Sequence, residues 1–170
     1  MLEHQYGAKV KRIAFRHKDC GWKRFSVSLS FDNNTEYRCV FNADPFMLGF
    51  LKNIYLRPSC HTCNFTNTDR PGDLTMADFW GVANKYPEYD KEDKGTSLIL
   101  VNTTKGQDWL DSCKKQLFIG QADLDTAKAG NPVLLRPCSR SSERDIFFRD
   151  LEILLFFSLI HKYKLHAPSL

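Results

Sequence analysis

The clearest hydrophobic pattern in the chain is an alternation with a period of two residues. Residues 25–31 place an apolar side chain at every second position and serine at the positions between. Residues 32–34, Asp-Asn-Asn, favour a tight turn, and residues 37–41 alternate again on the return. Because a period of two puts one set of side chains on each face of a strand, these segments predict a β-hairpin.

Further apolar runs and capping residues predict the remaining elements. We expect strands over residues 10–15, 74–80 and 97–101. We expect helices over residues 2–6, 44–57, 103–117, 123–129 and 141–163, the last of them rich in aromatic residues. No repeat or flexible linker divides the chain. The pattern therefore predicts a single α+β domain over residues 1–170, with a mixed sheet that contains the hairpin, flanking helices and a long aromatic C-terminal helix.

Composition and charge exclude several classes of protein. The 170 residues carry a net charge of +4 with scattered basic residues, which does not indicate nucleic-acid binding. The N-terminus has no apolar signal core, and the longest apolar run, residues 153–160, is far shorter than the roughly 20 residues that span a bilayer. Six cysteines without an export signal are typical of reduced thiols, so we expect a cytoplasmic protein with no membrane span.

Cys60 and Cys63 form the one closely spaced cysteine pair. A redox dithiol of the thioredoxin type begins a helix, whereas here a helix is expected to precede the pair and loop-forming residues follow it. A metal site suits two converging thiolates but needs two more ligands, and the other four cysteines are isolated. From spacing alone, a metal role and two plain loop thiols both remain open. His61, between the two cysteines, is expected to be a loop residue or a hydrogen-bond donor to a ligand.

Three segments, in order, resemble the C-terminal region of the coenzyme F420 hydrogenase/dehydrogenase beta-subunit family. The first is Phe15-Arg-His-Lys-Asp-Cys-Gly-Trp22. The second joins Arg57-x-Ser-Cys-x-x-Cys-x-Phe65 to Asp73-Leu-Thr-Met-Ala-Asp-Phe-Trp-Gly81. The third is Lys94-Gly-Thr-Ser-Leu-Ile-Leu-Val-Asn-Thr-Thr-Lys-Gly106. The resemblance covers about residues 7–106 and departs from the family pattern at residues 71–72 and 76–77.

The resemblance implies an iron–sulfur flavoprotein that passes electrons between a donor and F420 or a related acceptor. Cys60 and Cys63 would then bind a [4Fe–4S] cluster, with the remaining ligands coming from outside this chain, and FAD would be the flavin. The family's N-terminal part, with its ferredoxin-like cysteine cluster, is absent here. The expected partners are therefore that N-terminal region or a partner subunit, together with a redox partner protein or a small-molecule acceptor.

Two segments of the resemblance are candidates for cofactor binding. One is the turn with a cation and an indole, and the other is the end of a predicted strand; their residues are Lys18, Gly21, Trp22, Asp78, Trp80 and Gly81. We expect the two segments to line one flavin-sized cleft. The alternative interpretations are a solvated lysine beside a packed indole, and a core tryptophan. Because no glycine-rich phosphate loop is present, no independent nucleotide motif supports the assignment.

A second hypothesis makes the chain a non-catalytic interaction domain that zinc or a cluster stabilises. The predicted C-terminal helix is apolar around most of its circumference in its second half. Such a helix is buried or faces a partner, and a homo-oligomer is one way to cover it.

Overall fold

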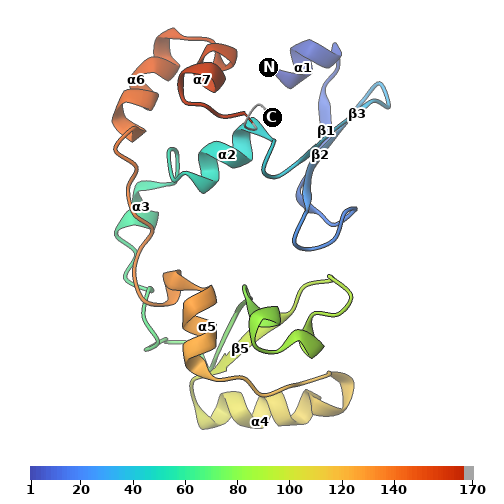
Figure 1. The fold of residues 1–170 in the computed structure, drawn as a ribbon, viewed down its shortest axis with the longest axis vertical. Helices are drawn as coiled ribbons and strands as arrows, with labels where there is room; N and C mark the ends of the chain where they lie inside the picture. The colour runs from blue at the N-terminus through green and yellow to red at the C-terminus, as the bar shows by residue number, and fades with distance from the viewer. Residues whose placement is uncertain (167–170) are drawn as a thin grey trace. The chain divides into compact units, whose positions relative to one another are not determined.

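The computed structural model describes residues 1–166, which form two compact units (Figure 1). The first unit consists of residues 1–61 and the chain from residue 139 onward; its elements are α1 (Leu2–Tyr6), β1 (Val10–His17), β2 (Ser26–Phe31), β3 (Glu36–Val40), α2 (Pro45–Leu51), α3 (Pro58–His61), α6 (Arg144–Ile153) and α7 (Phe156–Lys162). The second unit, residues 62–138, contains β4 (Leu74–Asp78), β5 (Ser97–Val101), α4 (Thr104–Cys113), α5 (Leu124–Gly130) and four 3₁₀ turns, η1 (Val82–Asn84), η2 (Pro87–Tyr89), η3 (Lys114–Gln116) and η4 (Pro132–Leu134). That residues 1–170 act as one domain stays a prediction.

The predicted hairpin is confirmed as part of a three-stranded antiparallel sheet in the order β1-β2-β3 (Figure 1). Both faces of the central strand are covered, because Ser26 and Ser28 are buried as fully as Val27 and Leu29. The hydroxyl of Ser28 donates a hydrogen bond to Glu36 Oε1 at 2.6 Å, which satisfies a polar group on this second face.

Helix α2 begins as its capping residues predict. The Asp44 carboxylate accepts a hydrogen bond from the Met47 amide at 2.8 Å, and Pro45 occupies the first helical position. The expected end near residue 57 is wrong, because the helix stops at Leu51. Asn53 adopts a left-handed conformation (φ 58°), which ends the helical hydrogen-bond ladder.

The single long C-terminal helix that we expected is wrong, since it is two helices, α6 and α7. Leu154 and Leu155, between α6 and α7, both have extended ψ angles of 146° and therefore break the helix. A continuous helix that is apolar on all sides buries only one face against a core. The break allows Leu159 to enter the same buried cluster as Phe147.

The α+β class is confirmed, whereas the mixed sheet is wrong. Strands β4 and β5 form a separate two-stranded antiparallel sheet in the second unit, and β4 ends at Asp78 rather than at residue 80. A second core packs on this sheet; its buried members are Phe79, Val82, Leu98, Ala127 and Leu134. Within residues 1–166, none of the helices combines the length and apolar character that crossing a membrane requires.

Candidate functional site

The cysteine pair begins in a single helical turn rather than in the expected loop. Cys60 lies in α3, and its amide donates a hydrogen bond to the Arg57 carbonyl at 2.9 Å. Cys63 follows the turn, and its carbonyl accepts a hydrogen bond from the Thr66 hydroxyl at 3.0 Å. Pro58 fixes the first residue of the turn in a helical φ, which accounts for the difference.

The donor set of this segment fits a shared metal or cluster site rather than a complete one. Both thiols are free and half-buried, so they are available as thiolate ligands. Among residues 1–166, no three or more His, Cys, Asp or Glu side chains gather closely enough to hold a metal ion. Two thiolates supply two of the four protein ligands that a [4Fe–4S] cluster takes.

The turn between β1 and β2 brings together Lys18, Gly21 and Trp22, the first three of the candidate cofactor residues. Gly21 adopts a positive φ of 92°, and its amide donates to the Lys18 carbonyl at 3.2 Å. Trp22 is buried, and the Lys18 ammonium lies 4.7 Å from the centre of its ring. The packed indole is confirmed, and binding of a cofactor at this turn stays a prediction.

Arg16 joins this cluster, although sequence reasoning did not select it. Its guanidinium carbon lies 5.0 Å from the Trp22 ring centre and 5.6 Å from that of Phe25. The signal was present, because Arg16 stands in the segment that resembles the family and two residues before Lys18. Lys18 lies one residue beyond the end of β1 at His17, so closeness in sequence to Lys18 and Trp22 is the signal that could have selected Arg16.

The second predicted segment ends β4 and turns into η1. Asp78 pairs with Ser97 of β5, and Gly81 takes a positive φ of 76° at the start of η1. Phe79 is the core residue here, whereas Trp80 is half-buried. The turn between β1 and β2 and the end of β4 belong to different compact units, so the expectation that they line one cleft stays a prediction.

The segments 73–81 and 94–106 are joined by a network around Asp73. Its carboxylate accepts a hydrogen bond from the Thr103 hydroxyl at 2.7 Å and forms an ion pair with Lys105 at 3.2 Å. The Thr103 hydrogen bond, and after it the one from Lys105, lower the pKa of Asp73 below its usual value. The amide of Asn102 donates to the Asp73 carbonyl at 2.9 Å. These contacts hold the two segments of the resemblance together.

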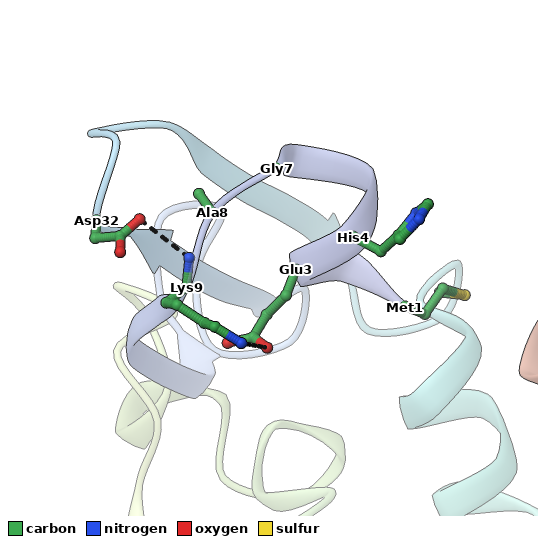
Figure 2. Close-up of a pocket in the computed structure, with 7 residues that line it drawn as sticks. All are labelled: Met1, Glu3, His4, Gly7, Ala8, Lys9 and Asp32. Carbon is green, nitrogen blue, oxygen red and sulfur yellow. Dashed lines mark hydrogen bonds and ion pairs between the residues drawn. The ribbon is translucent and has the colours of Figure 1, made fainter.

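An open pocket lies beside α1 in the first unit (Figure 2). It is lined by Met1, Glu3, His4, Gly7, Ala8, Lys9 and Asp32. Glu3 forms an ion pair with Lys9 at 3.3 Å and accepts a hydrogen bond from the Val10 amide at 2.9 Å. Asp32 accepts from the Lys9 amide at 3.0 Å. These bonds tie α1 to the sheet, and none of the predicted site residues lines the pocket.

Comparison with known proteins identifies one family. Residues 2–127 match the family model that describes the C terminus of the coenzyme F420 hydrogenase/dehydrogenase beta subunit. No curated protein and no solved structure matches the chain. The matched range contains the cysteine pair, the hairpin turn and the end of β4. Since it extends over well more than half of the 170 residues, the chain belongs to the coenzyme F420 hydrogenase/dehydrogenase beta-subunit family and carries its C-terminal region.

Proposed function

We propose that this chain is the C-terminal part of an iron–sulfur flavoprotein oxidoreductase that passes electrons between a donor and F420 or a related acceptor. The observation that carries the proposal is the pair of free, half-buried thiols, Cys60 and Cys63, inside the range that matches the family. When bound, the cluster and the flavin supply the electron-carrying chemistry, and the protein supplies binding and orientation.

Cys60 and Cys63 bind iron of a [4Fe–4S] cluster as thiolates in this proposal. The bonds from Cys60 to Arg57 and from Thr66 to Cys63 restrain the backbone on both sides of the pair, which limits the conformations of the two thiols. The remaining ligands come from outside residues 1–166. The family is that of a beta subunit, so the N-terminal region of such proteins or a partner subunit is the proposed source.

The turn between β1 and β2 and the end of β4 are the proposed contacts to FAD. Lys18 carries a positive charge that the buried Trp22 ring positions, and the left-handed Gly21 keeps the turn backbone accessible to an anionic group. Trp80 is half-buried and offers an aromatic face for stacking, with Asp78 and Gly81 on either side of it along the chain. The donor or acceptor is a redox partner protein or a small molecule, and we propose a cytoplasmic location.

One observation favours the second function, a non-catalytic interaction domain with zinc or a cluster as a structural staple. Ile153 and Leu155 are each 80% exposed beside the break between α6 and α7, and Phe157 is also exposed. Apolar side chains gathered in one short exposed segment are typical of a surface that contacts a partner or a second copy of the chain.

Anaerobic purification of the protein with its partner subunit, followed by measurement of iron, sulfide, zinc and flavin, tests the proposal. We expect a brown protein with broad visible absorbance, and loss of bound iron when Cys60 and Cys63 are both replaced by serine. The matched control replaces Cys20 and Cys113, which lie outside the pair, and should keep its iron. Unchanged iron in the C60S/C63S protein would overturn the ligand assignment. A colourless protein that holds zinc would favour the interaction domain.

A further inference from the structure

We propose that strand β5 pairs with the same strand of a second copy of this chain, so that their two-stranded sheets join into one continuous antiparallel sheet centred on Ile99. The hydrogen-bond ladder, the surface of the sheet and the residues at its edge each point to this contact. It lies apart from the proposed redox function, because it uses neither the cysteine pair nor the turn between β1 and β2.

The ladder between β4 and β5 determines which backbone groups face outward. The amide of Asn102 donates a hydrogen bond to the Asp73 carbonyl at 2.9 Å, and the amide of Phe79 donates to the Thr96 carbonyl at 2.8 Å. The register between these two bonds is unbroken. Because the bonded pairs of an antiparallel ladder recur at every second residue, the even-numbered residues of β5 bond β4.

The odd-numbered residues of β5, Ser97, Ile99 and Val101, therefore direct their backbone away from β4. No hydrogen bond between residues 1–166 reaches the N–H or C=O groups on this outer edge. Ser97 and Val101 are exposed, so the edge is open at both of its ends. An extended backbone is the partner that satisfies such a row of donors and acceptors.

One face of the sheet is apolar and exposed. Leu98 is buried in the second core, so its neighbours along β5 place their side chains on the opposite face. Met76 of β4 stands directly opposite Ile99 on this second face and is 71% exposed. Val101 is 40% exposed on the same face. Joining two sheets edge to edge brings the two Ile99 side chains into contact and removes apolar area from water.

The edge of β5 lacks the features that keep edge strands apart. Residues 97–101 contain no charge and no proline, and their pairing with β4 has no register shift. In the three-stranded sheet, edge strand β1 carries Lys11 and Arg16 and has two register shifts. Edge strand β3 carries Glu36 and Arg38. Charges and bulges oppose pairing between edges, so the first sheet is protected where β5 is not.

A second copy fits this edge because β5 is complementary to itself. In an antiparallel pair centred on Ile99, the two Ile99 residues exchange hydrogen bonds, and Ser97 of each chain exchanges bonds with Val101 of the other. Every outward N–H and C=O group of both strands is thereby satisfied. The residues that face each other are uncharged, so no repulsion opposes the pairing. Such a contact is isologous and closes as a dimer.

Sedimentation velocity of the full chain in reducing buffer, from about 1 to 300 μM, tests the dimer. We expect a reversible equilibrium with a Kd on the order of 10 μM, because one short strand forms a small interface. Ile99→Lys sets two like charges on Cα atoms about 5.5 Å apart and should weaken the dimer at least roughly tenfold. The matched control is Met76→Lys, whose two copies lie roughly 14 Å apart, beyond the Debye length, and should change the Kd less than about twofold.

Ser97→Pro is a second variant, which decides the question if Ile99→Lys alters the circular dichroism spectrum. It removes an outward N–H group at the first residue of β5 and leaves the bonds to β4 intact. Each end of the contact loses one hydrogen bond, so we expect the dimer to weaken at least about fivefold. A Kd unchanged in Ser97→Pro would contradict the backbone pairing.

Hydrogen exchange of single amides, followed by NMR, identifies the surface that the dimer uses. We expect the amides of Ile99 and Val101 to exchange more slowly in concentrated than in dilute protein, and those of Leu98 and Leu100 to be protected in both. Exchange at Ile99 and Val101 that does not depend on concentration would overturn the proposal, because any dimer would then use another surface.

A chain that stays monomeric at about 300 μM, or equal loss of the dimer in Ile99→Lys and Met76→Lys, would also overturn it. Protection of the Ile99 and Val101 amides by the partner subunit, but not by concentrated chain, would assign the edge to an extended segment of that subunit instead. None of these measurements involves iron or flavin, so the dimer and the redox proposal stand or fall separately.

Discussion

Gly106 of α4 lies directly against the backbone carbonyl of Asp73, so that a Cβ atom at residue 106 would stand 2.3 Å from the Asp73 oxygen. The amide of Gly106 donates to the Thr103 hydroxyl at 3.1 Å, and the same hydroxyl donates to the Asp73 carboxylate. Two segments of the family resemblance therefore meet at a contact that only glycine permits.

Replacement of Gly106 by alanine should destabilise the protein. Alanine favours helix over glycine, but the added methyl group meets a backbone carbonyl that is itself hydrogen-bonded and cannot move away. We expect a net loss of about 1–3 kcal/mol, which urea unfolding would measure. Asp108→Ala, on an exposed position of the same helix, is the control and should change stability little. A Gly106→Ala protein as stable as the unaltered chain would show that α4 can shift away from β4.

The Asp123 carboxylate is predicted to make the stability of the second unit depend on pH. It accepts hydrogen bonds from Lys85 and the Tyr86 hydroxyl, each at 2.6 Å, and from the Thr126 amide. These bonds, that from Lys85 foremost, hold the pKa of Asp123 well below its ordinary value of 3.8. A carboxyl group with a lowered folded-state pKa stabilises the fold above its unfolded pKa, and this contribution is lost as the pH falls below that value.

Asp123→Asn should therefore lower the melting temperature at neutral pH and make the fall in stability on acidification shallower. Thermal unfolding at about pH 7, 5 and 3 would show both effects. Asp125→Asn removes the same charge from an exposed residue two positions along α5 and should retain the steep acid dependence. Equal acid dependence in the Asp123→Asn and unaltered proteins would mean that other carboxylates carry it.

Lys52 is predicted to stabilise the first unit through the end of α7. Its ammonium donates to the carbonyls of Tyr163 at 3.2 Å and Lys164 at 2.9 Å, which would otherwise lack helical partners. Lys52→Met keeps most of the side-chain length and should cost about 1 kcal/mol in chemical unfolding. Lys11→Met, at an exposed position of β1, is the control. No difference between the two variants would show that water replaces the lysine without loss.

The isolated chain is predicted to bind FAD weakly. Cys60 and Cys63 supply only two thiols for the proposed cluster. The residues from Lys18 to Trp22 would contact FAD through side chains, since they do not form a glycine-rich phosphate loop. The proposed cluster and flavin sites therefore need groups from outside the chain. Titration with FAD, followed by flavin fluorescence, should show no saturation in the low-micromolar range. Saturable low-micromolar quenching by a monomeric chain would show that this chain supplies the whole flavin site without groups from outside it.

The sequence by itself determined the features that depend on near neighbours. The alternation in residues 25–41 predicted the hairpin, and Asp44 was correctly expected to cap α2. Thr103 or Thr104 was expected to cap a helix, and Thr103 is the residue that caps α4. The short helix expected from residue 123 is α5, which Asp123 caps. A capping side chain bonds an amide three residues along the chain, so its signal is local and readable. The family was likewise predictable, because its three segments retain their residue types and order.

Only the tertiary structure decided the features that depend on distant residues. The last helix breaks at Leu154 because Leu159 and Phe147 share a core with Ile54, which is far away in the sequence. The sheet divides in two because β1, β2 and β3 pair among themselves while β4 pairs with β5 alone. Arg16 joined the candidate site through its contact with the buried Trp22 ring. Long-range packing overrides local propensity where apolar burial gains more free energy than an unbroken helix or strand, and no short sequence window contains both sides of such a contact.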